Sequence, residues 1–511
     1  MAASQICQLH CRCAGSPSVT TIRLRQPAVA LASDRSFWLQ DIAAAPATEP
    51  LRGDERADVV IVGGGYTGLW TALRILELAP QTRVVILEAD LCGSGASGRN
   101  GGQVHSWFAE IDQISAVVGL EEARLLCADT VASIAELKTL QQNGTIDMDL
   151  RLDGWLWTAS SIAQEGAWET AVALTAAVGE NRFRPLTAED IQRRTGSSAS
   201  YVGVVETTAG TVHPAKLAIG LRKLALTRGV IIHERSPVLA IEPGMTCTVR
   251  TAHGAVRADK IVLAANGWLS ALPELRRHLY VVGSEVIATA AVPELLDSIG
   301  WRDGASICDS QAQVLYYQRT IGGRVVFGRG SGNVAFSGNL GASFNRSPEH
   351  GRDNMRELHR VYPSLRGVAI EYDWSGPIDC VPEHVPVFDH LRDHPNIFYG
   401  MGFNGTGIAQ TPIAGRILAS LVLERKDRWE RKRSGRHRAA HGAAARAVAI
   451  SRRQTCPRRG APQERGRDPQ PQGGQDHQSF GGTEARQAQE VAGHLAHRHA
   501  LQTMSRHVPS R

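Results

Sequence analysis

The sequence predicts an α/β protein in which a discontinuous domain around a parallel sheet is joined to an α+β domain with an antiparallel sheet. An apolar run at 58–62, typical of a buried strand, leads through a glycine turn into a helical stretch at 69–78 and a second strand at 83–88. Short alternating runs between 278 and 377 indicate the antiparallel sheet. The 511 residues include 51 glycines and are 43% hydrophobic, which suits a globular core with tight turns.

The other elements follow in chain order from the same patterns. Residues 111–200 are expected to be mainly helical, with a helix from Glu110 to Leu140 and short strands near 150–157. Residues 1–35 have no pattern, and we expect them to be disordered. The later part of the chain predicts helices at 214–227 and 408–423 and strands at 230–232, 259–265, 314–317, 324–328 and 397–399.

The positive charge of the chain is concentrated at its C-terminal end. The formal net charge is +6, but residues 424–511 hold 17 Arg and 2 Lys against 8 acidic residues, so the rest of the chain is mildly acidic. Residues 431–511 contain little that could form a core, which predicts a disordered, Arg-rich tail. An RNA-binding arm is one interpretation. We favour coding sequence read in a shifted frame, and expect no nucleic-acid partner.

Metal centres, disulfides and membrane spans are not expected. The nine cysteines are scattered, and Cys7, Cys11 and Cys13 have no second ligand pair at zinc-like spacing. The chain has no run of about 18 apolar residues, so we expect no membrane span. The odd number of scattered cysteines leads us to expect a protein of the reducing cytoplasm.

The first motif that indicates chemistry is the glycine turn Gly63-x-Gly65-x-x-Gly68. Gly63 permits a tight turn, Gly65 lets the backbone approach a pyrophosphate, and Gly68 allows close packing of helix on strand. Glu88 ends the next strand, where a carboxylate accepts hydrogen bonds from ribose hydroxyls and repels a 2′-phosphate. The turn therefore predicts dinucleotide binding other than NADP, against the alternative of an ordinary glycine-rich turn.

A second glycine-rich segment follows at 93–103. Five glycines and two serines in eleven residues would let the backbone run alongside a long, flat ligand. A domain that binds only a nicotinamide cofactor more commonly continues into another crossover helix here, so the segment favours FAD over NAD. A mobile surface loop of the same composition is the alternative.

These motifs make the chain resemble the FAD-dependent amine and amino-acid oxidoreductases of the D-amino acid oxidase and glycine oxidase superfamily, within them the gamma-glutamylputrescine oxidoreductase-like members. The segments that carry the resemblance are 58–68, Glu88, 95–102, 259–267 and 402–408, in matching order over about 36–424. The resemblance implies a Rossmann-like FAD-binding domain from 57–115, 205–275 and 378–424, and a substrate domain from 116–204 and 276–377.

The resemblance also implies which residues hold FAD. The first glycine turn would hold the pyrophosphate, Glu88 the adenosine ribose, and residues 97–100 would lie beside pyrophosphate and flavin. Val238, in a strand after the turn at 210–214, would meet the adenine through its backbone. The predicted cofactor-binding residues are Gly63, Gly65, Tyr66, Thr67, Gly68, Glu88, Ser97, Gly98, Arg99, Asn100, Gly101, Val238, Ala265, Gly405, Thr406, Gly407 and Ile408.

The C-terminal glycine motif has its own physical reason. Residues 405–408 precede a helix, so their amides point at whatever lies beyond its N-terminus. Reduced flavin carries negative charge near N1 and the C2 carbonyl, and a helix N-terminus stabilises it. Pro412 is tolerated in a first helical turn, which predicts a helix starting nearby. A simple glycine-capped helix start is the alternative.

Candidate substrate residues lie on the predicted antiparallel sheet. Tyr317 and Arg319 have same-side spacing on a strand, and an arginine can hold a carboxylate with two hydrogen bonds. Trp374 is expected to wall the pocket or to pack in the core. His105 follows the second glycine segment and is a further candidate. The predicted catalytic residues are Tyr317, Arg319 and Trp374.

The reaction that the resemblance implies is oxidation of a C–N bond in an amine or amino acid. Hydride would pass to flavin N5, the imine would hydrolyse in water, and molecular oxygen or an electron carrier would reoxidise the flavin. A neutral amine needs no strong base, and the sequence has no convincing nucleophile–base pair. The alternative is a protein that binds FAD but is catalytically defective because of an aberrant C-terminus.

Overall fold

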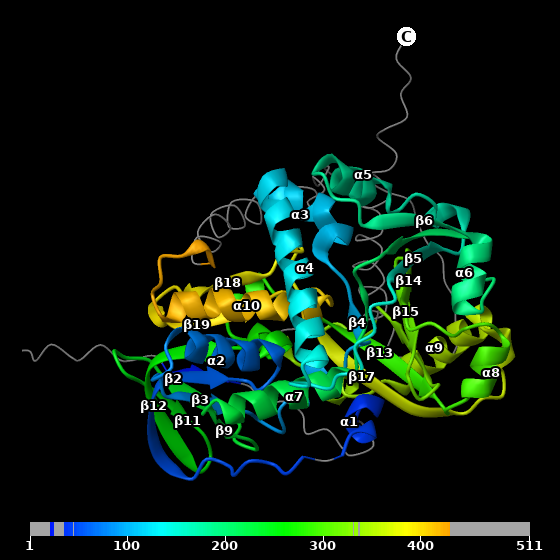
Figure 1. The fold of residues 1–511 in the computed structure, drawn as a ribbon. Helices are drawn as coiled ribbons and strands as arrows, with labels where there is room; N and C mark the ends of the chain where they lie inside the picture. The colour runs from blue at the N-terminus through cyan, green and yellow to red at the C-terminus, as the bar shows by residue number, and fades with distance from the viewer. Residues whose placement is uncertain (1–20, 25–34, 44, 331, 336–337, 430–511) are drawn as a thin grey trace, which may run out of the picture.

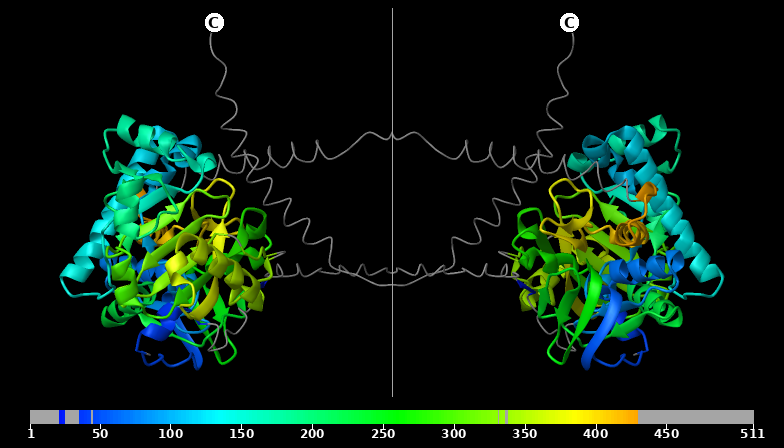
Figure 2. Two further views of the ribbon diagram at one scale, coloured as in Figure 1. Left: turned by 90° about the vertical axis from the view of Figure 1, so that its right-hand side faces the viewer. Right: turned by 90° about the vertical axis from the view of Figure 1, so that its left-hand side faces the viewer.

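The computed structural model describes residues 21–24, 35–43, 45–330, 332–335 and 338–429. Two sheets dominate these residues, and helices cover them (Figures 1 and 2). The predicted tail at 431–511 and most of 1–35 lie outside the described residues. The helices are α1 (Phe37–Asp41), α2 (Tyr66–Leu78), α3 (Ile111–Val118), α4 (Leu120–Gln142), α5 (Glu169–Ala177), α6 (Ala188–Thr195), α7 (Pro214–Thr227), α8 (Pro293–Ser298), α9 (Pro348–Val361) and α10 (Gly407–Val422).

The larger sheet has nine strands within the described part of the chain. Five of them run parallel in the order β19-β12-β2-β3-β9, and the others pair antiparallel at the margins. Its strands are β1 (Ile22–Arg23), β2 (Gly53–Val62), β3 (Val84–Leu87), β9 (Ile231–His233), β10 (Ala240–Glu242), β11 (Cys247–Arg250), β12 (Gly254–Leu263), β18 (Val387–Leu391) and β19 (His394–Met401).

Both faces of this parallel region are buried, as parallel strands require. Val59 and Ile61 pack with α2, α7 and α10, whereas Val60 and Val62 pack with residues of β10, β11 and the segment after β12. Figure 1 shows α10 beside α2 over the sheet, and a Cβ on Gly415 of α10 would lie 2.8 Å from the backbone of Trp70 in α2. The two helices therefore pack backbone to backbone.

The smaller sheet has eight strands among the described residues, in the order β17-β13-β16-β15-β14-β5-β7-β6. Its neighbours pair antiparallel except β14 and β5, which are parallel. The strands come from two separate stretches of chain: β5 (Trp155–Ala159), β6 (Phe183–Thr187), β7 (Val202–Glu206), β13 (Tyr280–Thr289), β14 (Ser306–Asp309), β15 (Leu315–Arg319), β16 (Val325–Arg329) and β17 (Ile370–Cys380). The predicted antiparallel sheet is thus present and larger than expected.

Four local expectations need correction. The single helix expected over Glu110–Leu140 is two helices, because Gly119 adopts a φ of +83° between α3 and α4. Residues 22–23, within the stretch expected to be disordered, form β1, which pairs with β10. Val238 lies between β9 and β10 and is not in a strand.

The fourth correction concerns the proline of the last helix. Pro412 lies inside α10, beyond its first turn, and has no amide to donate to the carbonyl of Ile408. The Thr411 hydroxyl donates to that carbonyl at 3.2 Å. The hydroxyl compensates for the missing backbone hydrogen bond, so the helix continues through the proline.

No helix among the described residues is both long and apolar enough to cross a bilayer. The same residues contain no group of three or more His, Cys, Asp or Glu side chains placed to hold a metal ion.

Candidate cofactor site at the edge of the parallel sheet

The predicted cofactor motifs meet at one edge of the nine-stranded sheet. Because β2, β12 and β19 are parallel, Val62, Leu263 and Tyr399 lie side by side near their carboxyl ends. The first glycine turn follows β2, the 264–267 segment follows β12, and the C-terminal glycine turn follows β19. Helices α2 and α10 therefore both begin at this edge, where open α/β sheets bind ligands.

The first turn needs its glycines for close packing. Gly63 has a φ of +109°, and a Cβ there would lie 2.5 Å from the Ala264 carbonyl oxygen. A Cβ on Gly68 would lie 2.0 Å from the carbonyl oxygen of Gly63. The Ser97 hydroxyl accepts from the Tyr66 amide at 2.9 Å and would lie 2.9 Å from a Cβ on Gly65. The second glycine segment thus contacts the start of α2 directly.

Glu88 is tied to the same turn. Its carboxylate accepts from the Gly64 amide at 2.6 Å and from the Asp90 amide at 3.0 Å. Burial raises the pKa of the Glu88 carboxyl, and the two amides act in the opposite direction. The carboxylate lies at the end of β3, at the edge where the sequence predicts the ribose.

Side chains of the second glycine segment mainly support its own backbone. The Arg99 guanidinium donates to the carbonyls of Ser94, Asn345 and Ser375, which links this segment to β17. The Asn100 side chain accepts from the Gly102 amide at 2.9 Å and donates to two carbonyls of the preceding turn.

The C-terminal turn is held by a buried carboxyl that the sequence did not single out. Asp379 accepts from the Gly402 amide at 2.6 Å and from the Asn266 side chain at 2.7 Å. It therefore joins the segments that follow β12 and β19. Burial raises the pKa of Asp379 to about 7, while its hydrogen-bond donors lower it. Gly405 has a φ of +87°, and a Cβ on it would contact only the Ile378 side chain, at 3.6 Å.

Val238 and Ala265, two of the predicted cofactor-binding residues, lie in a core position and at the start of a turn. Val238 is buried in the core on one side of the parallel sheet. Ala265 immediately precedes a 3-10 turn at Asn266–Ala271, and its carbonyl accepts from the Trp268 amide at 3.1 Å.

The structure does not bring Tyr317 and Arg319 to the glycine motifs. Tyr317 stacks on Phe327 in a buried cluster. Arg319 donates to Asp297 at 2.6 Å and to the Trp301 carbonyl. Neighbouring side chains on a strand point to opposite faces, so the residues that face the second glycine segment are Tyr316 and Gln318. A Cβ on Gly101 would lie 2.6 Å from the Tyr316 ring.

Of the other two substrate-side candidates, Trp374 is buried and His105 is half-buried. Trp374 is fully buried, and its indole N–H donates to the Arg99 carbonyl at 2.8 Å, so it packs in the core while touching the second glycine segment. His105 stacks on Trp155 with 4.9 Å between ring centroids, and burial lowers its pKa.

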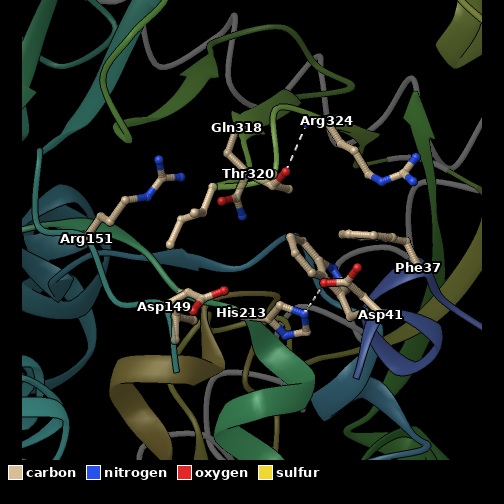
Figure 3. Close-up of a pocket in the computed structure, with 12 residues that line it drawn as sticks. Phe37, Asp41, Asp149, Arg151, His213, Gln318, Thr320 and Arg324 are labelled. Atoms are coloured by element: carbon tan, nitrogen blue, oxygen red, sulfur yellow. Dashed lines mark hydrogen bonds and ion pairs between the residues drawn. The ribbon is translucent and has the colours of Figure 1, made fainter. Parts of the chain in front are cut away.

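A small cavity lies between α1, the start of α7 and the end of β15 (Figure 3). It has a volume of about 60 Å³, far below the several hundred Å³ typical of cofactor pockets. Gln318, His213 and Asp41 are among its lining residues, and the His213 and Asp41 side chains face each other at 3.4 Å. The lining residues include none of 63–68 or 402–408, so the cavity does not coincide with the two glycine turns at the sheet edge.

The comparisons with known proteins agree with this geometry. The model of the FAD dependent oxidoreductase family, DAO, matches residues 58–421. The chain is 32% identical over 377 residues to gamma-glutamylputrescine oxidoreductase of Escherichia coli K12, covering 73% of this chain and 85% of that protein. The crystal structure of glycine oxidase from Geobacillus kaustophilus superposes with a TM-score of 0.61 at 20% identity, covering 73% and 96%. That of L-proline dehydrogenase from P. horikoshii gives 0.60 at 17%, covering 74% and 96%.

The matched family is one of oxidoreductases that depend on a flavin dinucleotide. The chain belongs to the DAO family of FAD dependent oxidoreductases, and FAD is its cofactor. The predicted family, enzyme class and cofactor are confirmed.

Proposed function

We propose that this chain oxidises a C–N bond of a small amine or amino acid. The support is that two glycine turns, followed by α2 and α10, lie at the same edge of one parallel sheet. The names of the relatives point the same way, since those proteins act on gamma-glutamylputrescine, glycine and L-proline.

The residues at this edge fit FAD. The turn at 63–68 would receive the pyrophosphate at the N-terminus of α2, and Glu88 the ribose. The amides of 405–408 would face the isoalloxazine ring, with Val238 and Ala265 toward the adenosine end and beneath the dinucleotide. Bound FAD supplies the hydride acceptor at N5, and the imine product hydrolyses in water.

We assign the cofactor lobe to 57–115, 205–275 and 378–424, and the substrate lobe to 116–204 and 276–377. The strands of the two sheets support this division with small shifts, since β2 begins at Gly53 and β17 ends at Cys380. On the substrate side we replace Tyr317 and Arg319 with Tyr316 and Gln318, which contact Gly101 and face the second glycine segment.

The test is an anaerobic reduction of the purified protein. We expect a yellow protein whose flavin absorbance is bleached by one member of a panel of polyamines, N-methyl amino acids and D-amino acids. Mixing the reduced protein with oxygen or with an artificial electron acceptor then identifies which of the two reoxidises the flavin. A yellow protein that no amine reduces would support the defective alternative, and a colourless protein that takes up no FAD would contradict both.

A further inference from the structure

Four consecutive carbonyls of the second glycine segment each accept a hydrogen bond from a side chain of another element. Ser36 Oγ donates to the Gly98 carbonyl at 2.5 Å, and Trp374 Nε1 to that of Arg99 at 2.8 Å. Trp38 Nε1 donates to the Asn100 carbonyl at 2.9 Å, and Gln318 Nε2 to that of Gly101 at 2.5 Å. We call these four donors the carbonyl clamp.

The clamp combines a helix near the N-terminus with two strands of the antiparallel sheet. Ser36 and Trp38 belong to the start of α1, Trp374 to β17 and Gln318 to β15. Trp38 and Trp374 are 2% and 0% exposed, and they pack in one cluster with Ala215 of α7 and Val286 of β13. Helix α1 is therefore wedged between the helical layer of the parallel sheet and the antiparallel sheet, next to α7 (Figure 1).

The clamp determines where the amides of the segment point. In a trans peptide the N–H points opposite to the C=O of the same unit. The two indoles hold the carbonyls of Arg99 and Asn100, so the amides of Asn100 and Gly101 point away from the clamp. Within the described part of the chain, these two amides donate to no protein acceptor. Two successive free amides form a donor pair for one acceptor oxygen.

We propose that Trp38 and Trp374 are positioning residues, which hold the amides of Asn100 and Gly101 ready for an acceptor oxygen of the bound cofactor, with Ser36 and Gln318 completing the clamp. This inference rests on the proposed function, because it takes FAD to lie along the second glycine segment. It assigns to α1, outside the matched family region, a part in holding the cofactor.

The test compares three tryptophan-to-phenylalanine variants. Trp38→Phe and Trp374→Phe keep an aromatic ring and remove the indole donor. Trp301→Phe is the matched control, since Trp301 is equally buried, its indole N–H has no partner, and it packs in the Tyr317 and Tyr362 cluster.

We expect each clamp variant to raise the Kd for FAD about threefold to tenfold, the effect of one hydrogen bond, and to shift the visible flavin spectrum. In FAD-free protein, hydrogen exchange of the Arg99 and Gly102 amides, which are hydrogen-bonded within the segment, should become faster. Trp301→Phe should lower Tm without these changes. Clamp variants that match Trp301→Phe in FAD affinity, spectrum and exchange would overturn the proposal. If the wild-type chain binds no FAD, the proposed function fails, whereas the exchange rates still decide whether the clamp orders the segment.

Discussion

The sequence indicates the glycine turns at the edge of the parallel sheet more clearly than the side chains on the face of the antiparallel sheet. At the edge, backbone packs closely on backbone at Gly63 and Gly68, where a Cβ would clash with a neighbouring carbonyl oxygen. On the antiparallel sheet, side chains contact the second glycine segment. The sequence pattern favours Tyr317 and Arg319, whereas in the structure Tyr316 and Gln318 face this segment. A site formed by closely packed backbone can be recognised in a sequence because it requires glycine. A site formed by side chains depends on which face of the strand each residue occupies, and this is set by the strand register.

The largest expected effect is at the edge itself. Gly65→Val should raise the Kd for FAD more than about 100-fold, because even its Cβ would lie 2.9 Å from Ser97 Oγ and its methyl groups would fill the space before α2. Titration of the apoprotein with FAD measures this.

Gly341→Val is the control for that substitution. Gly341 has φ and ψ of −78° and −172°, close to the −82° and −175° of Gly65, and a Cβ there would have no neighbour within 4 Å. Equal FAD binding by the two variants would show that the first turn does not carry the cofactor.

At the C-terminal turn we expect a pH-dependent effect on stability. Burial raises the pKa of Asp379 to about 7, so the folded protein holds this proton more tightly than the unfolded chain. Ionisation therefore opposes folding as pH rises from about 4 to about 7, by up to about 4 kcal/mol. Asp379→Asn has no such titration, so the excess stability of the wild type over the variant should shrink between pH 4.5 and 7.5. Denaturant unfolding at both pH values measures it, and a constant gap would contradict the assignment.

Arg319 and Gln318 offer a direct contrast on one strand. Arg319→Leu should lower the free energy of unfolding by about 2 kcal/mol, because Asp297 and the Trp301 carbonyl lose their donor, while KM and FAD affinity stay unchanged. Gln318→Leu should instead weaken FAD binding, because the Gly101 carbonyl loses its donor. A rise in KM for Arg319→Leu without loss of stability would restore the original prediction of a substrate-binding arginine.

The smallest effect concerns the proline in α10. Thr411→Val removes the hydroxyl that serves the Ile408 carbonyl, and we expect a loss of about 1 kcal/mol by denaturant unfolding. Thr411→Ser keeps the hydroxyl and should be close to wild type. Equal losses in both variants would mean that the methyl group, not the hydrogen bond, supports the helix.

The sequence predicted most of the fold because its patterns are local. The helix at Pro214–Thr227 begins and ends where the proline and apolar spacing placed it, and the strands before and after the first glycine turn follow from their apolar runs. The break at Gly119 was missed because a single glycine is compatible with a continuous helix.

Two residues that the structure adds to the candidate site could not be found from the sequence, for a different physical reason. Asp379 and Trp38 act on segments far away in the chain, and neither lies in a glycine motif. Their role depends on which sheets and helices pack together, which no local pattern encodes. The only sequence signal near Trp38 is the run Ser36-Phe37-Trp38-Leu39, a helix cap followed by apolar residues.

We propose that two glycine turns, far apart in the chain, hold one ligand at one edge of the parallel sheet. Hydrogen exchange of the full chain with and without saturating FAD tests it most directly. We expect FAD to slow exchange in two separate peptides at once, one covering 63–70 and the other 402–409. Protection of the first peptide with none in the second would contradict the account.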